Sequence, residues 1–238
     1  MKVFIIGAAG KLGQRLSAIL VAQGDAVTGM HRGPDQAEAV EGTGAASLVA
    51  DLVEVSADEL AAMTAGHDAV VFSAGAHGTG RDLTTLIDGK GAQKAAEAAE
   101  QAGASRFVLV SAFRDSERGG ALGDAYEHYI RTKRDAEIHL TRTALDWIIV
   151  RPGHMLDGVG TGRVSAGPAL REDDVSRADV ADFIAEALRA PKLSRTIVEL
   201  TDGTTPIPDA VRRVASSIGP RRRSAGEGAS ESTPAQDG

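Results

Sequence analysis

The sequence feature that most constrains the fold is a glycine-rich turn close to the N-terminus. Gly7, Gly10 and Gly13 have the spacing G-x-x-G-x-x-G, and the apolar run 3–6 precedes them. Apolar residues recur at helical spacing over the next ten residues. A buried strand that turns sharply into a helix presents the N–H groups of that helix to phosphate. The turn therefore predicts a dinucleotide-binding site, and an empty glycine turn is the alternative in a chain with 28 glycines.

Short β-rich runs alternate with alanine-rich segments of helical period along most of the chain. Such alternation indicates βαβ units, in which helices cover both faces of a parallel sheet. Most of the runs are apolar throughout, as strands buried on both faces should be. We expect a Rossmann-type α/β fold, with a doubly wound parallel sheet in three αβα layers and a single domain. The strands are expected at 3–6, 26–30, 46–49, 69–72, 106–110, 147–150 and 197–200.

The length of 238 residues fits one such domain followed by a short appendage. The domain is expected over 1–215. Within it, Ser176 and Asp179 have the S-x-x-D spacing of a capping box and predict a helix that ends near Pro191. Residues 216–238 carry almost no apolar side chains to offset the entropy of ordering them, so a disordered tail is expected there.

Composition and charge exclude several classes of function. The chain has no cysteine, which removes disulfides, thiolate nucleophiles and Cys-ligated metals. Its six histidines are scattered and form no H-E-x-x-H pair, so no metal site is expected. A net charge of −7 argues against nucleic-acid binding, and the N-terminal apolar run is too short for a signal peptide or a membrane span. We expect a cytoplasmic monomer or homodimer that binds a small-molecule substrate.

The end of the second expected strand bears on the choice between the two nicotinamide dinucleotides. An acidic residue there usually binds the ribose 2′-hydroxyl of NAD, but this chain has His31 and Arg32 at that place. An arginine can pair with a 2′-phosphate, so NADP(H) is favoured. Asp35 lies close enough to keep NAD(H) as an alternative.

Tyr129 and Lys133 form a Y-x-x-x-K pair in an expected helix between the fifth and sixth strands. Residues four apart share one face of a helix. A lysine ammonium lowers the pKa of a neighbouring phenol, so Tyr129 is a candidate proton donor or acceptor. Ser111, at the end of the fifth strand, is the candidate third member because its hydroxyl could bind a substrate oxygen. An exposed helical pair and a turn-forming serine are the respective alternatives.

These residues together resemble the short-chain dehydrogenase/reductase superfamily, in its atypical NAD(P)H-binding branch. That branch includes NmrA-like proteins, biliverdin-reductase-B-like flavin reductases and bacterial sugar epimerases. The resemblance covers about residues 1–215. It rests on motifs that follow one another in order: 7–13, Asp51-Leu52, Ser73-Ala74-Gly75, 106–111, Tyr129 with Lys133, Arg151-Pro152-Gly153 and 176–180.

The resemblance implies a path for the cofactor along the ends of the strands. Asp51 and Leu52 would lie beside the adenine, Ala74 and Gly75 along the middle of the cofactor, and Pro152 and Gly153 near the nicotinamide. The full set of expected cofactor-binding residues is Gly7, Ala9, Gly10, Lys11, Leu12, Gly13, His31, Arg32, Asp51, Leu52, Ser73, Ala74, Gly75, Lys133, Pro152 and Gly153.

The chain also departs from the pattern of its relatives. Ser111 is followed by Ala112 where relatives often have a second hydroxyl residue, so Ser116 is an alternative substrate-orienting group. Asp88 stands where classical members of the superfamily have an asparagine. Only about 25 residues separate Arg151 from the helix at Ser176, which predicts a small substrate pocket. Its walls are expected from the loops 76–82 and 113–124, whose arginines Arg81, Arg114 and Arg118 could bind an anionic substrate.

The expected activity is hydride transfer between NADP(H) and a small carbonyl, alcohol or sugar-like substrate, as an oxidoreductase or an epimerase. Tyr129 would transfer the proton and Lys133 would hold the ribose. Two alternatives stay open: a non-catalytic, NmrA-like redox sensor that binds NADP(H), and a flavin or biliverdin type of reductase.

Overall fold

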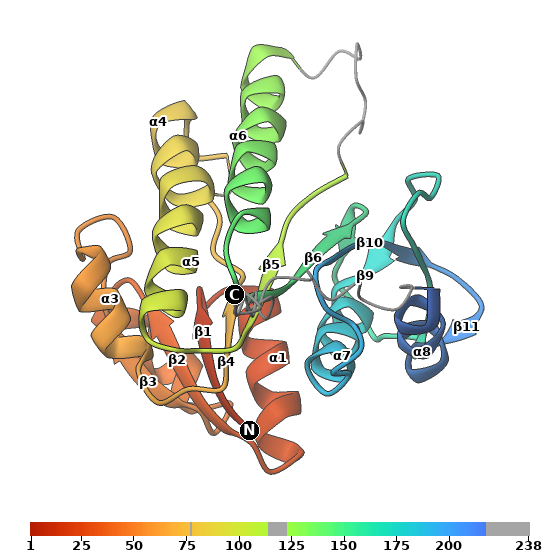
Figure 1. Ribbon diagram of the computed structural model, residues 1–238, viewed down its shortest axis with the longest axis horizontal. Helices are drawn as coiled ribbons and strands as arrows, with labels where there is room; N and C mark the ends of the chain where they lie inside the picture. The colour runs from red at the N-terminus through yellow and green to blue at the C-terminus, as the bar shows by residue number, and fades with distance from the viewer. Residues whose placement is uncertain (77, 114–122, 218–238) are drawn as a thin grey trace, which may run out of the picture.

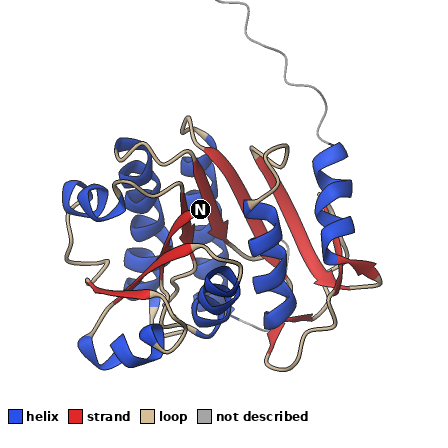
Figure 2. Cartoon of the chain, turned by 90° about the horizontal axis from the view of Figure 1, so that it is seen from below, coloured by secondary structure: helices blue, strands red, loops and turns tan. Residues whose placement is uncertain are grey.

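The computed structural model describes residues 1–76, 78–113 and 123–217. Among these residues, nine strands form one sheet in the order β11-β8-β10-β6-β5-β4-β1-β2-β3. They fan across the width of the molecule in Figure 2. A short parallel ladder, β7 (Met155–Leu156) with β9 (Val175–Ser176), lies outside this sheet. The strands of the sheet are β1 (Lys2–Ile6), β2 (Ala26–His31), β3 (Ala46–Val49), β4 (Ala69–Phe72), β5 (Arg106–Val110), β6 (Asp146–Pro152), β8 (Arg163–Gly167), β10 (Thr196–Asp202) and β11 (Thr205–Pro206).

Helices cover both faces of the sheet (Figure 1). One face carries α1 (Lys11–Ala22), α7 (Arg177–Leu188) and α8 (Ile207–Ser217), and the other carries α3 (Ala57–Thr64), α5 (Ala92–Gln101) and α6 (Gly123–Thr141). The shorter helical segments are η1 (Pro34–Gln36), α2 (Ala37–Glu41), α4 (Arg81–Leu83) and the π-helix η2 (Thr84–Gly91).

Strand β1 shows why the expected strands are apolar throughout. Val3 and Ile5 pack in the hydrophobic core under α1 and α7, while Phe4 and Ile6 pack in the second core under α3 and α5. Successive side chains of a strand point to opposite faces, so a strand between two helix layers needs apolar residues at every position. The three-layer αβα fold predicted from the sequence is confirmed.

All seven predicted strands are present as β1 to β6 and β10, and β3, β4 and β5 have the predicted bounds. The chain starts at β1, adds β2 and β3 on one side, and returns to add β4 on the other. The sheet order therefore reverses between β1 and β4, which is where open α/β sheets bind ligands.

The predicted parallel sheet has an antiparallel edge that the sequence did not indicate. Strands β8 and β11 were not predicted, and β8 pairs antiparallel with both β10 and β11. The sequence of β8, RVSAG, contains little except small and polar residues, so it carries no clear strand pattern. The long flanking strand β10 supplies most of its pairing partners.

The capping box predicted at Ser176 is half correct. Ser176 is the N-cap of α7, where its hydroxyl accepts a hydrogen bond from the N–H of Ala178. Asp179 does not reach back to Ser176. Its buried carboxylate accepts the N–H groups of Thr161 and Gly162, at 2.9 and 2.7 Å, and so fixes the preceding loop to the start of α7.

Helix α8 runs to Ser217, two residues beyond the domain boundary predicted at 215. The rest of the predicted tail lies outside the described residues. No helix in the described part of the chain is both long enough and apolar enough to cross a bilayer.

Candidate functional site

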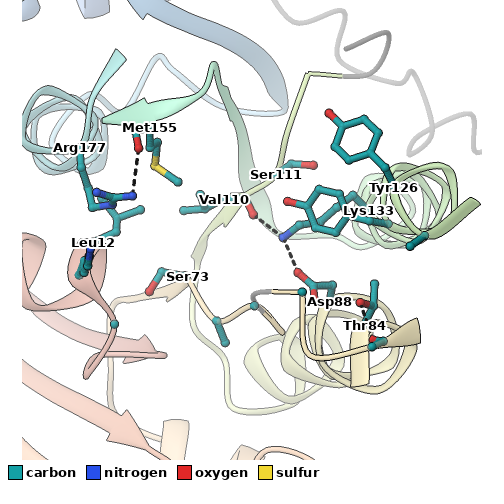
Figure 3. Close-up of a pocket in the computed structure, with 18 of the residues that line it drawn as sticks. Leu12, Ser73, Thr84, Asp88, Val110, Ser111, Tyr126, Lys133, Met155 and Arg177 are labelled. Atoms are coloured by element: carbon teal, nitrogen blue, oxygen red, sulfur yellow. Dashed lines mark hydrogen bonds and ion pairs between the residues drawn. The ribbon is translucent and has the colours of Figure 1, made fainter. Parts of the chain in front are cut away.

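A cavity of about 860 Å³ lies at the carboxyl ends of β1, β4 and β5. One part of its wall is the glycine turn, and another is Ser73, Ala74 and Gly75 after β4. Further walls come from Ser111 after β5 and from the first turns of α6 (Figure 3). The cavity therefore brings together residues predicted for cofactor binding and residues predicted for proton transfer.

The glycine turn is tight enough to demand glycine at two positions. Gly7 has φ of +88°, and a Cβ there would lie 2.6 Å from the backbone N of Ala74. A Cβ on Gly13 would lie 2.4 Å from the carbonyl oxygen of Gly7. At the N-cap of α1, Gly10 provides no side chain to bind the N–H groups of the first turn. Since these groups border the cavity, the turn fits a bound diphosphate.

A smaller cavity of about 290 Å³ lies on the side of β2. Both cavities are lined by the same five residues at their boundary, namely Ala9, Gly10, Ser73, Ala74 and Gly75. A ligand with two halves joined by a diphosphate fits this arrangement, with one half in each cavity and the diphosphate against the turn. The two cavities therefore suit a dinucleotide.

The smaller cavity is lined by the predicted residues His31, Arg32, Asp51 and Leu52. The ring of His31 is buried, with Nδ1 2.9 Å from the carbonyl oxygen of Gly33 and Nε2 2.7 Å from the hydroxyl of Ser47 on β3. Both ring nitrogens are thus engaged within the protein, so His31 shapes the wall and its ring has no nitrogen left for a ligand.

Arg32 is exposed at the mouth of the same cavity, whereas Asp35 lines neither cavity. Gln36 also lines the smaller cavity, and its side-chain oxygen accepts the backbone N–H of Arg32 at 3.0 Å. Gln36, the last residue of η1, was missed because a single glutamine carries no motif. Asp51 accepts the N–H of Val53 at 2.8 Å, which orders the turn after β3.

In the large cavity, Lys133 is held by two partners from different elements. Its ammonium donates to the carbonyl oxygen of Val110 at 3.0 Å and lies 3.1 Å from Oδ1 of Asp88. It also lies 5.8 Å from the centre of the Tyr129 ring. Burial opposes the charged form of Lys133, but the charges of Tyr129, Asp88 and Glu137 outweigh it and raise the pKa of Lys133. The ammonium therefore stays charged beside Tyr129.

Asp88 reaches Lys133 from the π-helix η2. Its other oxygen, Oδ2, accepts the N–H of Ala76 at 2.9 Å, and the side chain is almost fully buried. A π-helix widens one turn by using i→i+5 hydrogen bonds, and such turns are frequent at functional sites. The π-helix packs closely against α6, since a Cβ on Gly89 would lie 2.9 Å from the side chain of Thr132 on α6. Asp88 is thus a buried partner of Lys133.

Ser111 lies at the end of β5, beside Tyr126 and Lys133 in Figure 3. It lines the cavity and is only 4% exposed. Within the described residues its hydroxyl has no hydrogen-bond partner. Because buried polar groups are almost always paired, such a hydroxyl at a cavity wall is suited to bind a ligand atom. The alternative residue Ser116 lies outside the described residues, as do Arg114 and Arg118.

A buried ion pair anchors α6 to the sheet one turn beyond Lys133. Arg151 on β6 binds Glu137 through two hydrogen bonds, of 2.9 and 2.6 Å, and lies 3.6 Å from Glu199 on β10. Glu137 follows Lys133 by four residues, so both face the sheet from the same side of α6. This pair fixes the rotation of the helix that carries Tyr129.

The wall of the large cavity that faces Lys133 is cationic. Lys11 was predicted there, but Arg177 was not. Arg177 at the start of α7 and Met155 face the cavity across from Lys133 (Figure 3). Asp157 bridges Arg177 and Lys11, with 2.5 Å between Oδ2 and the Lys11 ammonium. Burial and the neighbouring Arg15 lower the pKa of Arg177. Arg177 follows the N-cap serine and carries no motif of its own.

Three residues predicted to bind the cofactor, Gly13, Pro152 and Gly153, line neither cavity. Pro152 and Gly153 are buried, and a Cβ on Gly153 would overlap the carbonyl oxygen of Asp173 at 1.8 Å. Gly153 is therefore required by packing against the loop before β9. Arg81, predicted for the pocket wall, does line the large cavity, as does Tyr126, which was not predicted. The part of the chain that the structure describes holds no cluster of side chains suited to a metal ion.

Residues 7–191 match a family model described as NAD(P)H-binding. The chain is 39% identical over 216 residues to a Bacillus subtilis protein named "Uncharacterized sugar epimerase YhfK", across 90% of this chain and all of that protein.

Solved structures show the same likeness. A Bacillus halodurans protein named as an NAD-dependent epimerase/dehydratase superimposes with a TM-score of 0.82 at 35% identity, over 90% of this chain and all of that one. ChuY from Escherichia coli O157:H7, named an anaerobillin reductase, superimposes with a TM-score of 0.72 at 27% identity, over 85% of this chain and 97% of that one.

Proposed function

The chain belongs to the NAD(P)H-binding family, within the atypical short-chain dehydrogenase/reductase group, and from this premise we propose a specific activity. The protein is an NADP(H)-dependent oxidoreductase or epimerase that acts by hydride transfer on a small carbonyl, alcohol or sugar-like substrate. The observation that carries the proposal is the shared cavity, whose wall includes the glycine turn together with Ser111, Tyr129 and Lys133.

A bound nicotinamide would supply a hydride to the substrate carbon, or accept one from it. In the reducing direction, the Tyr129 hydroxyl donates its proton to the substrate oxygen and is left as a phenolate. The Lys133 ammonium stabilises that phenolate, and its raised pKa keeps it charged for this purpose. Ser111, whose hydroxyl has no partner among the described residues, donates to the same substrate oxygen and orients the carbonyl. Oxidation runs through the same contacts in reverse.

Asp88 has a positioning role in this scheme. It binds Lys133 with one oxygen and the Ala76 backbone with the other, so it fixes the ammonium relative to the loop after β4. The amide nitrogen of an asparagine cannot accept a hydrogen bond, so an asparagine at this place would keep only one of these two contacts and would not balance the lysine charge. The carboxylate therefore supports a permanently charged Lys133.

Preference for NADP(H) is supported by Arg32 at the mouth of the smaller cavity. The first test is a fluorescence titration with NADPH and NADH. We expect NADPH to bind at least about tenfold more tightly, and Arg32→Ala to remove that preference. Arg142→Ala, an exposed arginine that lines neither cavity, is the control. Failure of the wild-type protein to bind either dinucleotide would refute the proposed function.

A second test addresses the proton donor. Once a substrate is found by following NADPH consumption over a carbonyl panel, Tyr129→Phe should lower kcat by about 10²- to 10⁴-fold. Cofactor affinity should change little. Tyr126→Phe removes a hydroxyl from the neighbouring ring, 6.1 Å away between centroids, and should cost far less.

A second candidate function is a reductase that needs hydride transfer without Tyr129. The similarity to ChuY, which is named an anaerobillin reductase, at 27% identity supports this second candidate. Unchanged turnover in Tyr129→Phe, with NADPH still consumed, would select this candidate over the first.

A further inference from the structure

The wall opposite Tyr129 contains an ion cluster that the proposed chemistry does not use. Lys11 on α1 and Arg177 on α7 both line the large cavity, and both bind one carboxylate, that of Asp157. Arg177 also donates to the carbonyl oxygen of Met155 at 3.1 Å. Two cations from different helices thus meet a single anion at the edge of the cavity.

The cluster has more positive than negative charge. Arg15 follows Lys11 by four residues on the same face of α1, and its charge acts on Arg177. The first turn of α1 contains no acidic residue and no side-chain cap. Among the described residues, Asp157 is the one carboxylate that forms an ion pair with Lys11 or Arg177, so three cations and the positive end of a helix lie around a single anion.

The segment that carries Asp157 lies between two anchored points of the chain. Before it, Met155 and Leu156 pair with β9. After it, the N–H groups of Thr161 and Gly162 are held by Asp179. Between these points Asp157 is half exposed and Val159 is 94% exposed, and the carboxylate of Asp157 is paired with Lys11 and Arg177.

We propose that Lys11 and Arg177 form a two-cation clamp for the cofactor diphosphate, and that Asp157 occupies the clamp until the diphosphate displaces it. The position supports the diphosphate as the occupant, because Lys11 directly follows Gly10 at the boundary of the two cavities. The proposal rests on the proposed function and adds a competing carboxylate to the same site. It assigns roles to Asp157 and Arg177 that no motif indicates.

The distinguishing consequence is a gain of affinity on removing a charge. Asp157→Asn should lower the Kd for NADPH by about threefold at low salt, because the competing ion pair is lost. The gain should shrink as salt is raised. Arg177→Met should raise the Kd by on the order of tenfold, since a charge-assisted contact is removed.

Both variants have matched controls. Asp174 is 52% exposed and pairs with His154, so Asp174→Asn makes the same charge change away from the cavities. Arg189, at the other end of α7, pairs with Asp25 and controls for loss of an arginine from that helix. Circular dichroism of each variant checks that it is folded.

Calorimetric titration with 2′-phospho-ADP-ribose, which has the diphosphate and no nicotinamide, should reproduce the gain in Asp157→Asn. Adenosine 2′-monophosphate, which lacks the diphosphate, should bind equally to both proteins. An unchanged or raised Kd for NADPH in Asp157→Asn would overturn the proposal while leaving the proposed function intact, provided that wild-type protein binds NADPH.

A wild-type protein that binds no dinucleotide would overturn both the clamp and the proposed function. The clamp could instead serve an anion on the substrate. In that case Asp157→Asn would leave the NADPH affinity unchanged and strengthen binding of inorganic phosphate to the preformed NADPH complex, which would reject the diphosphate as occupant.

Discussion

At the glycine-turn end of the large cavity, the consecutive residues 9–12 form the wall, whereas the opposite end gathers buried side chains from β5, η2 and α6. The glycine-turn end depends on the absence of side chains at two positions, because a Cβ on Gly7 or Gly13 would overlap neighbouring backbone. The second depends on charges held out of water, with Lys133 and Asp88 both almost fully buried. The two ends should therefore fail in different ways when they are mutated.

The largest effect is expected at the side-chain end. Lys133→Met leaves the buried carboxylate of Asp88 without its counter-ion, which costs about 3–5 kcal/mol of unfolding free energy. Urea denaturation followed by the fluorescence of Trp147, the single tryptophan, measures this loss. The double variant Asp88→Leu with Lys133→Met removes both charges and should recover part of it. An additive or greater loss in the double variant would show that the pair is not coupled.

At the backbone end, Gly7→Ala is expected to cost about 3 kcal/mol, from the positive φ and the overlap with Ala74. Gly24 has a nearly equal φ of +86° with nothing within 4 Å of a Cβ, so Gly24→Ala isolates the conformational part, at about 1 kcal/mol. Equal losses in the two variants would show that contact with Ala74 is unimportant.

A smaller effect should appear in the pH dependence of stability. Because the pKa of Lys133 is raised in the folded protein, folding gains stability that is fully present below the unfolded pKa of about 10.4. This stability is lost as pH rises through the folded pKa. Denaturation midpoints measured from pH 8 upward should therefore fall less steeply in the Asp88→Leu, Lys133→Met double variant than in the wild type.

The smallest effect on stability is expected for Ser111→Ala. Unlike the substitutions above, it should stabilise the protein. The substitution removes a buried hydroxyl with no partner among the described residues, so the protein should be stabilised by about 1 kcal/mol or less. Turnover should fall at the same time if the hydroxyl orients the substrate. A clear loss of stability would instead mean that Ser111 is paired within the folded protein.

The same contrast explains what the sequence could predict. The glycine turn is local, so its spacing indicated both the strand and the helix around it. Most of the seven strands were predicted because burial on two faces demands continuous apolar runs, as in β1. Strands β8 and β11 were not, since β8 is composed of small and polar residues and forms only through pairing with β10.

At the site, Tyr129 and Lys133 were found by their helical spacing. Arg177, Met155 and Gln36 were not, because each enters a cavity wall only through tertiary packing and has no spacing to a partner in the sequence. Asp88 was noted as a departure from a family pattern, but its pairing with Lys133 depends on the wide turn of η2, which residue preferences do not reveal. Asp179 was assigned to the wrong partner because the N–H groups that it accepts, those of Thr161 and Gly162, reach it only through tertiary packing.

The wide turn of η2 has a consequence for how this chain could change by insertion and deletion. A π-helical turn accommodates one residue more than an α-helical turn would. Deleting a single residue between Asp88 and α5 would restore the α-helical repeat and rotate Asp88 by about 100° relative to α5. Deletion of one codon would thus remove the pairing of a carboxylate with Lys133. Homologues in which η2 has a different length should therefore also have a different residue at position 88.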